Sequence, residues 1–402
     1  CITDAFYLDR EDCHIKQKLN TIGGFQEHVA NNQYFKDKED YLRELLDLFD
    51  VSSEDKVFDL FETALLNEHK IVSSCDFTID TGKRHLPKYK MTKEESKQFE
   101  TNEDLFWSLI EQGLAEKVKE EDFDKYIDRI QTEVEVIKEG DVIDYFLIVR
   151  DIVNWARNNG ILIGVGRGSV GGTLIGYLLG LHYLNPFDYD LSFSRFLNKG
   201  RVKVSLPDID MDFPSNKRED IKNYMEQRFG ETQVCSVGTY TTMKIKGAIK
   251  DLARLESGCE FKDVNIVTSF IENDCETITD LFRLAFKNKS VKNFIVDYSD
   301  IINDLALVLN QPKARSIHAC AMMIFPDEYD MYHWSPIRIQ DGMPVSEYEG
   351  VELDSSGFLK EDILGILQLD KFQDIIDLIK ENTRQDINIY TLPLDEDEVY
   401  RY

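Results

Sequence analysis

The chain has 402 residues, with 47 Lys and Arg against 75 Asp and Glu, which gives a formal net charge of −28. This acidity argues against a generic nucleic-acid binder, because binding to phosphates depends on Lys and Arg. The content of 42% hydrophobic and 11% aromatic residues excludes disordered and fibrous classes. Seven dispersed cysteines form no CxxC pair and no apolar run is long enough to span a membrane. We therefore expect a cytoplasmic protein with reduced thiols and no membrane association.

Helices dominate the first third of the chain. Residues 1–24 predict a short strand followed by a helix, and apolar spacing over residues 37–75 predicts two amphipathic helices. Apolar residues recur at helical spacing again between residues 105 and 137. We expect a new domain to begin near residue 85.

A glycine-rich loop follows this helical region. The stretch DYFLIVRDIVNWARNNGILIGVGRGSVGGTLIGYLLGL predicts a helix, a buried strand at residues 161–165, a glycine loop at 166–173 and a second helix. Glycines let the backbone approach phosphate, and a helix N-terminus adds N–H donors. The loop matches neither a Walker A motif nor a GxGxxG dinucleotide fingerprint. A tight strand-to-helix turn is the alternative interpretation.

Three aspartates alternate with apolar residues in LPDIDMDF. If this segment is a strand, Asp208, Asp210 and Asp212 share one face about 6–7 Å apart. Such close carboxylates repel one another unless cations neutralise them, and Mg²⁺ prefers oxygen ligands of this kind. The alternative is a solvent-facing strand edge protected by negative charges. A helix over about 217–229 and a mainly helical region over about 240–309 follow.

A third carboxylate is expected near the first two, because two metal ions shared by several carboxylates suit phosphoryl transfer. CAMMIF and GFLKEDILGI predict strands, and LQLDKFQDIIDLIKEN predicts a helix. Asp362 lies on the second strand with Lys360 on the same face, whereas Asp370 lies on the helix. We prefer Asp362 as the third ligand, with Lys360 as a cation for phosphate.

Two basic segments interrupt the overall acidity. Residues 195–203 and the helix at 240–254 are rich in Lys and Arg. Both can bind phosphates, with Lys244, Lys246 and Lys250 the candidates for DNA binding. Solvated surfaces are the alternative interpretation.

Six motifs in this order resemble one known family. They are GRGSVGGTLIGYLLGL, FSRFLN, LPDIDMDF, SVGTYTTMKIKGAIKDLAR, ARSIHACAMMI and LKEDILGI. They are similar to the catalytic region of the bacterial-type C-family DNA polymerases, the DNA polymerase III alpha subunits. The resemblance runs nearly from end to end.

The resemblance implies an α+β fold, a nucleotidyltransferase palm of the beta-like type with a mixed sheet, a helical thumb insertion and a helical N-terminal connector. The implied domains are the end of a PHP domain (1–24), the connector (25–84), the palm (85–239 and 315–367), the thumb (240–314) and the start of the fingers (368–402). By the same resemblance Asp208, Asp210 and Asp362 bind two Mg²⁺ ions. The implied nucleotide-binding residues are Gly168, Ser169, Lys360, Arg195 and Arg201.

The function implied by the resemblance is template-directed transfer of dNMP from dNTP to a primer 3′-hydroxyl. The implied partners are primer-template DNA, dNTP, a sliding clamp and other replisome proteins. The alternatives are a template-independent nucleotidyltransferase and an inactive DNA-binding fragment.

The sequence departs from the family pattern in several places. Asp4-Ala5-Phe6 stands where the PHP metal motif DxH is expected, so no PHP nuclease activity is expected here. His318 is retained in a motif that has lost its glycines, which favours a structural or template-contact role over a catalytic base. We expect this chain to be a piece of a longer protein whose fingers are truncated, so activity of the isolated fragment is not expected.

Overall fold

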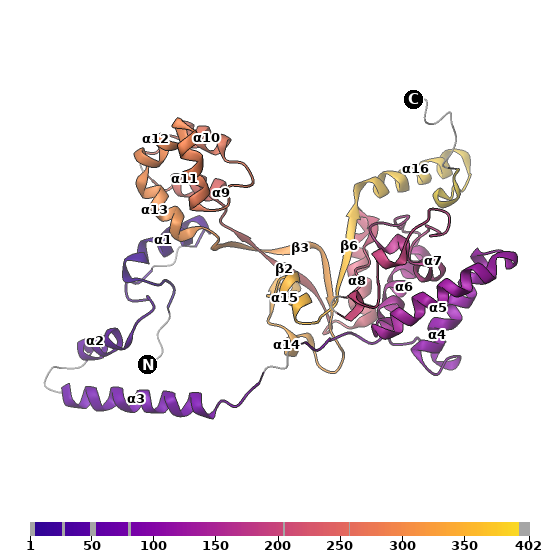
Figure 1. The fold of residues 1–402 in the computed structure, drawn as a ribbon, viewed down its shortest axis with the longest axis horizontal. Helices are drawn as coiled ribbons and strands as arrows, with labels where there is room; N and C mark the ends of the chain where they lie inside the picture. The colour runs from indigo at the N-terminus through magenta and orange to yellow at the C-terminus, as the bar shows by residue number, and fades with distance from the viewer. Residues whose placement is uncertain are drawn as a thin grey trace. The chain divides into compact units, whose positions relative to one another are not determined.

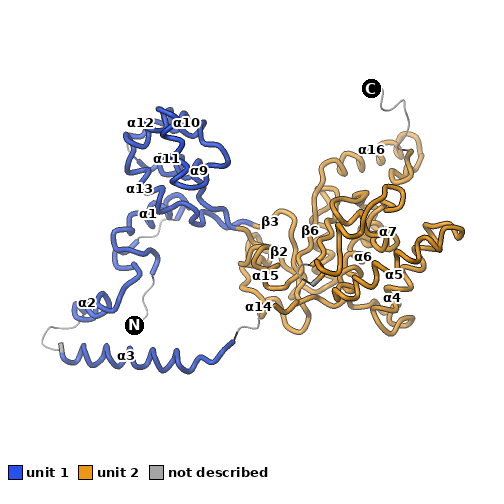
Figure 2. Tube along the Cα trace, viewed as in Figure 1, with its two compact units in different colours: residues 1–80, 240–316 blue, residues 81–239, 317–402 orange. Residues whose placement is uncertain are grey.

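The computed structural model describes residues 5–25, 29–48, 54–78, 82–203, 206–256 and 258–393. The chain divides into two compact units, each built from segments far apart in sequence (Figure 2). Residues 1–80 and 240–316 form the first, called the helical unit here, and residues 81–239 and 317–402 form the second, called the sheet unit. The boundaries lie within a few residues of those expected for the thumb insertion. The domain names themselves remain predictions.

The helical unit consists of amphipathic helices (Figure 1). They are α1 (Cys13–Ile22), α2 (Lys38–Leu48), α3 (Glu54–Ser74), α9 (Ile245–Ala253), α10 (Phe261–Phe270), α11 (Ile278–Lys287), α12 (Lys289–Asp297) and α13 (Ser299–Val308). Ile249, Leu281 and Leu305 lie in its core, and Ile15 of α1 joins them. The helices predicted over residues 37–75 and 240–309 are confirmed. The strand predicted in residues 1–24 is wrong for the described residues 5–25, where the only pairing is an isolated bridge between Tyr7 and Tyr34.

In the sheet unit, helices surround a mixed sheet. The helices are α4 (Asn102–Lys117), α5 (Phe123–Glu139), α6 (Ile143–Asn158), α7 (Leu174–Leu179), α8 (Arg218–Phe229), α14 (Met331–Trp334), α15 (Gly350–Ser355) and α16 (Leu367–Thr383). Single 3₁₀ turns elsewhere are Arg10–Asp12, Glu95–Lys97, Glu120–Asp122, Val170–Gly172, Phe193–Arg195, Arg201–Lys203, Ser215–Lys217 and Ile389–Thr391. Within the described ranges, no helix is both long and apolar enough to cross a membrane.

Six strands of the described chain form one sheet in the order β1-β6-β3-β2-β5-β4. They are β1 (Met211–Pro214), β2 (Val234–Thr242), β3 (Pro312–Ile324), β4 (Ile337–Gln340), β5 (Met343–Ser346) and β6 (Lys360–Ile366). β1 is parallel to β6 and β2 is parallel to β5, whereas β6 is antiparallel to β3 and β4 to β5. The expected mixed sheet and α+β architecture are confirmed.

Alternation along β3 divides the sheet unit into two cores. Met322 and Ile324 pack into the large core formed with α4 to α8, whereas Ala321 and Met323 pack on the opposite face beside α14 and α15. This is the period of two expected of a strand that is buried on both faces. On the adjacent strand β6, Ile363 packs into the large core.

Two predicted strands are absent or shorter in the structure. Residues 161–165 form no strand, and a single bond from the Gly164 N–H to the Asp212 carbonyl, at 2.9 Å, joins them to β1. The segment containing Asp208 and Asp210 is irregular, and β1 begins only at Met211. Apolar alternation shows which side chains are buried, but it does not provide the neighbouring strand whose hydrogen bonds define a ladder.

Candidate active site

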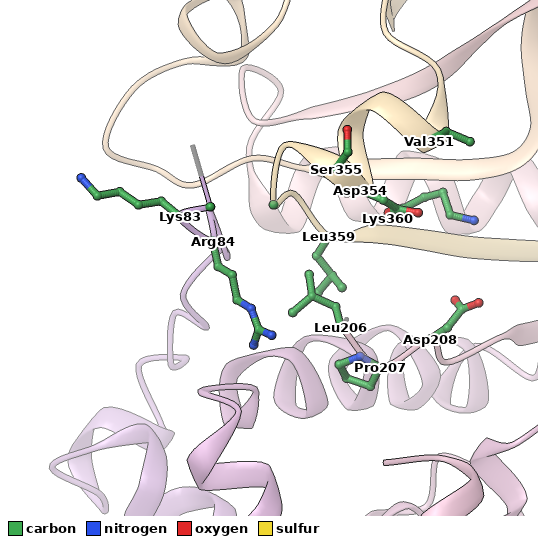
Figure 3. A pocket seen from close by; sticks show the side chains of 12 residues that line it. Lys83, Arg84, Leu206, Pro207, Asp208, Val351, Asp354, Ser355, Leu359 and Lys360 are labelled. Carbon is green, nitrogen blue, oxygen red and sulfur yellow. The ribbon is translucent and has the colours of Figure 1, made fainter. Parts of the chain in front are cut away.

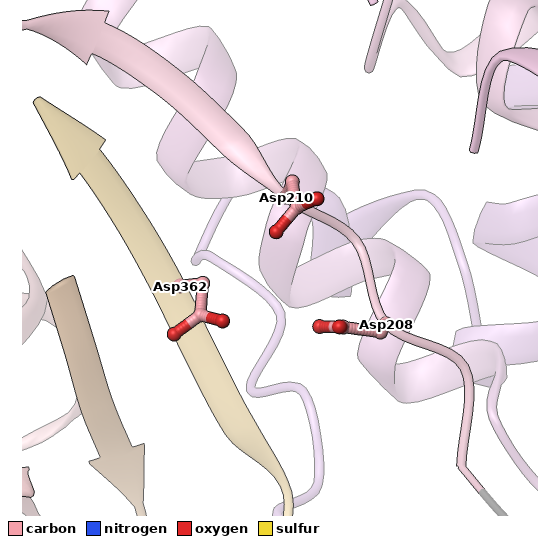
Figure 4. Close-up of side chains that lie close together, drawn as sticks. All are labelled: Asp208, Asp210 and Asp362. Atoms are coloured by element: carbon pink, nitrogen blue, oxygen red, sulfur yellow. The ribbon is translucent and has the colours of Figure 1, made fainter. Parts of the chain in front are cut away.

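Three carboxylates converge at the edge between β1 and β6 (Figure 4). Asp208 and Asp210 come from the irregular segment that leads into β1, and Asp362 comes from β6. One oxygen from each lies within 4.8 Å of the others. The parallel register pairs Met211 with Ile363, which brings the residues just before them, Asp210 and Asp362, side by side. The three predicted metal ligands are thus brought together.

The three carboxylates repel one another. Partial burial raises the pKa of Asp208 above its ordinary value, and the charges of Asp210 and Asp362 raise it further, against the opposing effect of Lys360. Burial likewise raises the pKa of Asp210, and Asp362 again adds to the shift. Each rise means that the carboxylate is less stable in its charged form here than in water. The cluster therefore favours binding of a cation.

Lys360 supplies part of the positive charge. Its Nζ donates a hydrogen bond to Oδ2 of Asp362 at 2.5 Å, from two residues away on the same face of β6. Burial disfavours the ammonium, but Asp362, Asp208 and Asp354 outweigh it and raise the pKa of Lys360. Lys360 therefore stays charged beside the carboxylates, where the sequence predicts a phosphate-neutralising cation.

The arrangement fits a hard divalent cation. The candidate metal ligands are all carboxylate oxygens. One further oxygen, Oδ1 of Asp362, is buried without a hydrogen-bond partner among the described residues. A buried oxygen of this kind is ordinarily satisfied by a hydrogen bond, a water or an ion. Oxygen-only sites with several carboxylates are typical of Mg²⁺ and related ions.

Asp212 lies outside the group of three converging carboxylates. Oδ1 of Asp212 lies 3.6 Å from Nη1 of Arg167. The side chain of Asp212 also packs so closely on Gly164 that a Cβ added at position 164 would lie 2.6 Å from the Cβ of Asp212. Asp212 instead holds the glycine loop, through Arg167 and the backbone of Gly164.

Arg167 is a site residue that the sequence reasoning did not single out. Burial raises the pKa of Asp210 and of Asp212, and the half-exposed guanidinium of Arg167 opposes both rises. Its position inside the glycine motif, two residues from Ser169, was the available signal. Arg167 therefore places a second positive charge beside the carboxylates, in addition to that of Lys360.

The glycine loop lies against the carboxylates. Gly166 and Gly168 have φ of +147° and +62°, a region that L side chains rarely adopt. A Cβ at position 168 would lie 3.4 Å from Oδ2 of Asp210. Gly168 and Ser169 are exposed. The loop therefore presents accessible backbone next to the candidate metal ligands.

The start of α7 is already occupied by a protein carboxylate. Glu133 of α5 is fully buried and accepts the backbone N–H groups of Leu174 and Ile175, both at 3.0 Å, and the hydroxyl of Thr173 at 2.7 Å. The expectation that this helix N-terminus offers free N–H donors to phosphate is therefore wrong. Any phosphate contact by the loop must come from the residues before Thr173.

Arg129 completes this buried link. Its Nε donates to Glu133 at 2.9 Å, and its Nη2 donates to the carbonyls of Gly172 and Leu191 at 2.6 and 2.9 Å. Arg129 and Glu133 thus attach the C-terminal end of the glycine loop and the start of α7 to α5. The apolar face of α5 contains this ion pair at helical spacing, a pattern that could have revealed it in the sequence.

The two predicted arginines lie next to each other. Nη1 of Arg201 donates to the carbonyl of Arg195 at 3.1 Å. Arg201 is close enough to the cluster for its charge to oppose the rise in the pKa of Asp208. The Arg195 side chain is exposed. Arg201 is thus directly linked electrostatically to the carboxylates.

His318 supports the backbone of β3. Its Nδ1 accepts the N–H groups of Cys320 at 3.3 Å and Ala321 at 2.9 Å. Ala321 pairs with Asp362 across the sheet. These hydrogen bonds agree with the structural role that the sequence favours for His318.

The alternative third ligand, Asp370, has other partners. It accepts the hydroxyl of Ser215 and, at 3.2 Å, the backbone N–H of Asn216. These contacts join α16 to the turn that follows β1. Asp370 therefore holds structure together at the far end of β1, while Asp362 faces Asp208 and Asp210.

The basic residues predicted to bind DNA lie on α9 in the helical unit. Lys244 and Lys246 are exposed and Lys250 is partly buried, while Ile245, Ala248, Ile249 and Leu252 face the core. Asp251 pairs with Arg254 at 2.9 Å and with Lys313 at 2.5 Å. Lys246 and Lys250 thus lie on the polar side of an amphipathic helix, and Lys244 immediately precedes it.

A large pocket adjoins the carboxylates on the side of Asp208 and Lys360 (Figure 3). Its volume is about 690 Å³, and its walls come from residues 82–84, 206–208 and 351–360. Arg84 lines it, with its guanidinium bound to the carbonyls of Gly140 and Val202. The acidic cluster is therefore open to a bulky reactant.

Comparison of the sequence with known proteins shows the family to which this chain belongs. The family described as the bacterial DNA polymerase III alpha NTPase domain matches residues 104–365, which is more than half of the chain. The chain belongs to the bacterial DNA polymerase III alpha subunit family. The matched segment includes the glycine loop and all three clustered aspartates.

Individual members of the family align over most of this chain. The DNA polymerase III subunit alpha of Aquifex aeolicus is 31% identical over 375 residues, covering 86% of this chain and 31% of that protein. That of Staphylococcus aureus strain Mu50 is 27% identical over 406 residues, covering 99% of this chain and 36% of that protein. This chain spans about a third of the length of these curated relatives.

Proposed function

We propose that this chain forms the nucleotidyl-transfer centre of a template-directed DNA polymerase. The reaction transfers dNMP from dNTP to the 3′-hydroxyl of a primer and releases pyrophosphate. The observation that supports it best is the convergence of Asp208, Asp210 and Asp362 beside Gly168, in a member of the DNA polymerase III alpha family. Because the chain spans about a third of its relatives, the activity of the whole protein is part of this proposal.

The proposed cofactor is a pair of Mg²⁺ ions held by the three aspartates. When bound, such ions favour ionisation of the attacking hydroxyl and stabilise charge on the leaving pyrophosphate. Lys360 and Arg167 flank the carboxylates with positive charge for the triphosphate. Gly168 and Ser169 offer accessible backbone for close approach of phosphate, and Arg201 adds a charge on the Asp208 side. Each of these groups binds or orients substrate.

The remaining assignments follow from the same proposal. The palm comprises residues 85–239 and 315–367, the thumb 240–314, and the fingers begin at 368. Lys244, Lys246 and Lys250 bind the backbone of the primer-template duplex. A sliding clamp, other replisome proteins and a cytoplasmic location complete the proposal.

Primer extension tests the reaction class. The assay uses the longest natural form of the protein that contains these 402 residues, with Mg²⁺ and one dNTP at a time. Templates differ in the base opposite the next position. The proposal expects incorporation of the complementary nucleotide only. Incorporation without regard to the template would instead establish a template-independent transferase.

Substitution tests the assigned residues in the same assay. Asp210→Asn should reduce the single-turnover rate by about a thousandfold or more, because electrostatic stabilisation at such a site contributes several kcal/mol. Asp220→Asn is the matched control, because Asp220 is a half-exposed residue of α8 whose ion pair is with Lys217 and which lies outside the cluster, and it should retain most of the rate. Equal losses in both variants would contradict the assignment.

A further inference from the structure

A second pocket in the sheet unit is lined by positively charged side chains. Its volume is about 510 Å³, within the range of small-ligand sites. Lys117 reaches it from the end of α4, and Arg150 and Arg157 reach it from one face of α6, seven residues apart. One acidic residue of the described chain, Glu116, also lines it. None of the three carboxylates of the candidate active site lines this pocket.

The three cations are not paired with acids. Three other poorly exposed arginines of the sheet unit are paired with acids, Arg129 with Glu133, Arg228 with Asp151 and Arg338 with Glu347. In the part of the chain that the structure describes, Lys117, Arg150 and Arg157 form no ion pair, although acids outnumber bases by 75 to 47. Three cations without an acidic partner therefore line this one pocket and concentrate positive charge there.

Capping of α7 explains part of this arrangement. Lys117 donates to the carbonyls of Tyr177 and Leu178, and Arg157 donates to that of Gly180 at 2.8 Å. These carbonyls end α7, where positive charge is favourable. Arg150 has no such role, because among the described residues its guanidinium makes no hydrogen bond or ion pair.

The charges also destabilise one another. Burial lowers the pKa of Lys117 to about 8, and the nearby charges of Arg157 and Arg150 contribute to the shift. Burial lowers the pKa of Arg150, and Arg157 acts in the same direction, whereas Tyr89, Glu95 and Asp151 oppose the shift. A bound anion would relieve both effects, because it would pair with charges that have already lost part of their hydration.

The pocket shares a wall with the segment that leads into the glycine loop. The rings of Tyr183 and Tyr390 stack with their centroids 3.7 Å apart at this wall. Tyr390 Oη donates to the Ile163 carbonyl at 2.8 Å and accepts the Ile163 N–H at 2.9 Å, and the Tyr183 N–H donates to Val165. A ligand in the pocket would therefore contact side chains that hold residues 163–165.

We propose that the pocket formed by Lys117, Arg150 and Arg157 is a binding site for phosphate groups, separate from the carboxylate cluster. The phosphates come either from a free nucleotide or pyrophosphate or from the backbone of a single nucleic-acid strand. Arginine forms charge-assisted hydrogen bonds to phosphate oxygens in both cases. This proposal does not depend on the proposed function, because it does not use the aspartates.

Binding without divalent metal tests the site. Pyrophosphate binding is measured by calorimetry, and binding of a fluorescein-labelled ten-nucleotide oligothymidylate by anisotropy, both in EDTA with the full chain. Arg150→Gln should weaken binding by about tenfold or more. The surface variant Lys93→Gln removes the same charge outside the pocket and should bind as the wild type does. Asp210→Asn should also bind normally, which separates this site from the proposed active centre.

The two probes distinguish the sources of phosphate. A loss confined to pyrophosphate identifies a free phosphate ligand, and a loss for the oligonucleotide identifies a strand-binding site. Lys117→Gln is the second variant, and thermal unfolding verifies that both variants fold. Absence of binding to either probe, or equal binding by wild type and folded Arg150→Gln, would overturn the proposal.

Discussion

The hydroxyl of Tyr145 accepts the backbone N–H of Ile209 at 2.9 Å, at the residue that separates Asp208 from Asp210. Tyr145 lies on α6 and is 2% exposed. Burial raises its pKa well above the ordinary value, so the hydroxyl stays neutral. Because Asp208 and Asp210 precede β1, this bond replaces a ladder hydrogen bond that a strand would have supplied. Tyr145 thus holds the carboxylate-bearing segment in place.

Removing the Tyr145 hydroxyl should loosen this segment. Tyr145→Phe leaves the buried N–H of Ile209 without a partner, which costs about 1–3 kcal/mol of unfolding free energy. Affinity for a divalent probe such as Mn²⁺, measured by electron paramagnetic resonance, should fall as well. Tyr126→Phe is the control, because Tyr126 is also largely buried and its hydroxyl accepts from Asn185, outside the carboxylate cluster. Unchanged Mn²⁺ affinity in folded Tyr145→Phe would contradict a positioning role.

The link between α5 and the glycine loop should contribute strongly to stability. Glu133→Ala leaves Arg129 unpaired and the donors of Thr173, Leu174 and Ile175 without their acceptor. Breaking a buried ion pair of this kind costs about 3–5 kcal/mol. Urea unfolding of the full chain measures the loss.

Glu135→Ala provides the matched control for this experiment. Glu135 lies on the same helix and pairs with Lys199, but both side chains are more than half exposed. Such a surface pair contributes less than about 1 kcal/mol. If the two variants unfold at the same urea concentration, Glu133 does not have the role that its contacts indicate.

His182 should make the protein sensitive to mild acid. Burial lowers the pKa of this side chain to about 4, against about 6.5 in the unfolded chain. Between these values the unfolded state binds more protons, so the free energy of unfolding falls as pH decreases from 6.5 to 4, by about 3 kcal/mol. His182→Gln retains a donor for the Thr173 carbonyl but does not titrate. Unfolding measured across this range should be less pH-dependent in the variant, and parallel curves would exclude His182 as the cause.

The lysines of α9 should contribute to DNA binding through charge alone. A variant with Lys246→Gln and Lys250→Gln should bind a primer-template duplex more weakly, with a slope of log affinity against log salt reduced by about 2. Lys262→Gln combined with Lys292→Gln, on α10 and α12, removes the same charge elsewhere in the helical unit. Equal slopes in the two double variants would show that α9 has no special role.

Helices were more predictable from the sequence than strands. The apolar spacing of residues such as Tyr126, Ile130 and Ile137 reports the buried face of α5 directly. By contrast, the alternation in LPDIDMDF correctly predicts that Ile209, Met211 and Phe213 are buried, but not that β1 begins at Met211. Strand pairing depends on a distant partner, here β6, which local patterns do not specify.

The carboxylates of the candidate site were predictable, but their supports were not. Asp208, Asp210 and Asp362 stand out because three acids in apolar surroundings are unusual. Glu133 pairs with Arg129 at a helical spacing that the sequence displays, but its contact to a residue 41 positions away and that of Tyr145 to one 64 positions away leave no local pattern. The chemistry of the site was therefore predictable from the sequence, whereas the contacts that position it are visible only in the structure.

The choice between Asp362 and Asp370 offers the most direct test of the proposed active centre. Both variants, Asp362→Asn and Asp370→Asn, are compared in single-turnover primer extension by the longest natural form of the protein. Asp362→Asn should lose about a thousandfold or more of the rate while remaining folded. Asp370→Asn removes only a carboxylate that binds Ser215 and Asn216, and it should stay within about tenfold of the wild type. Extension at the wild-type rate by Asp362→Asn would contradict the proposed centre.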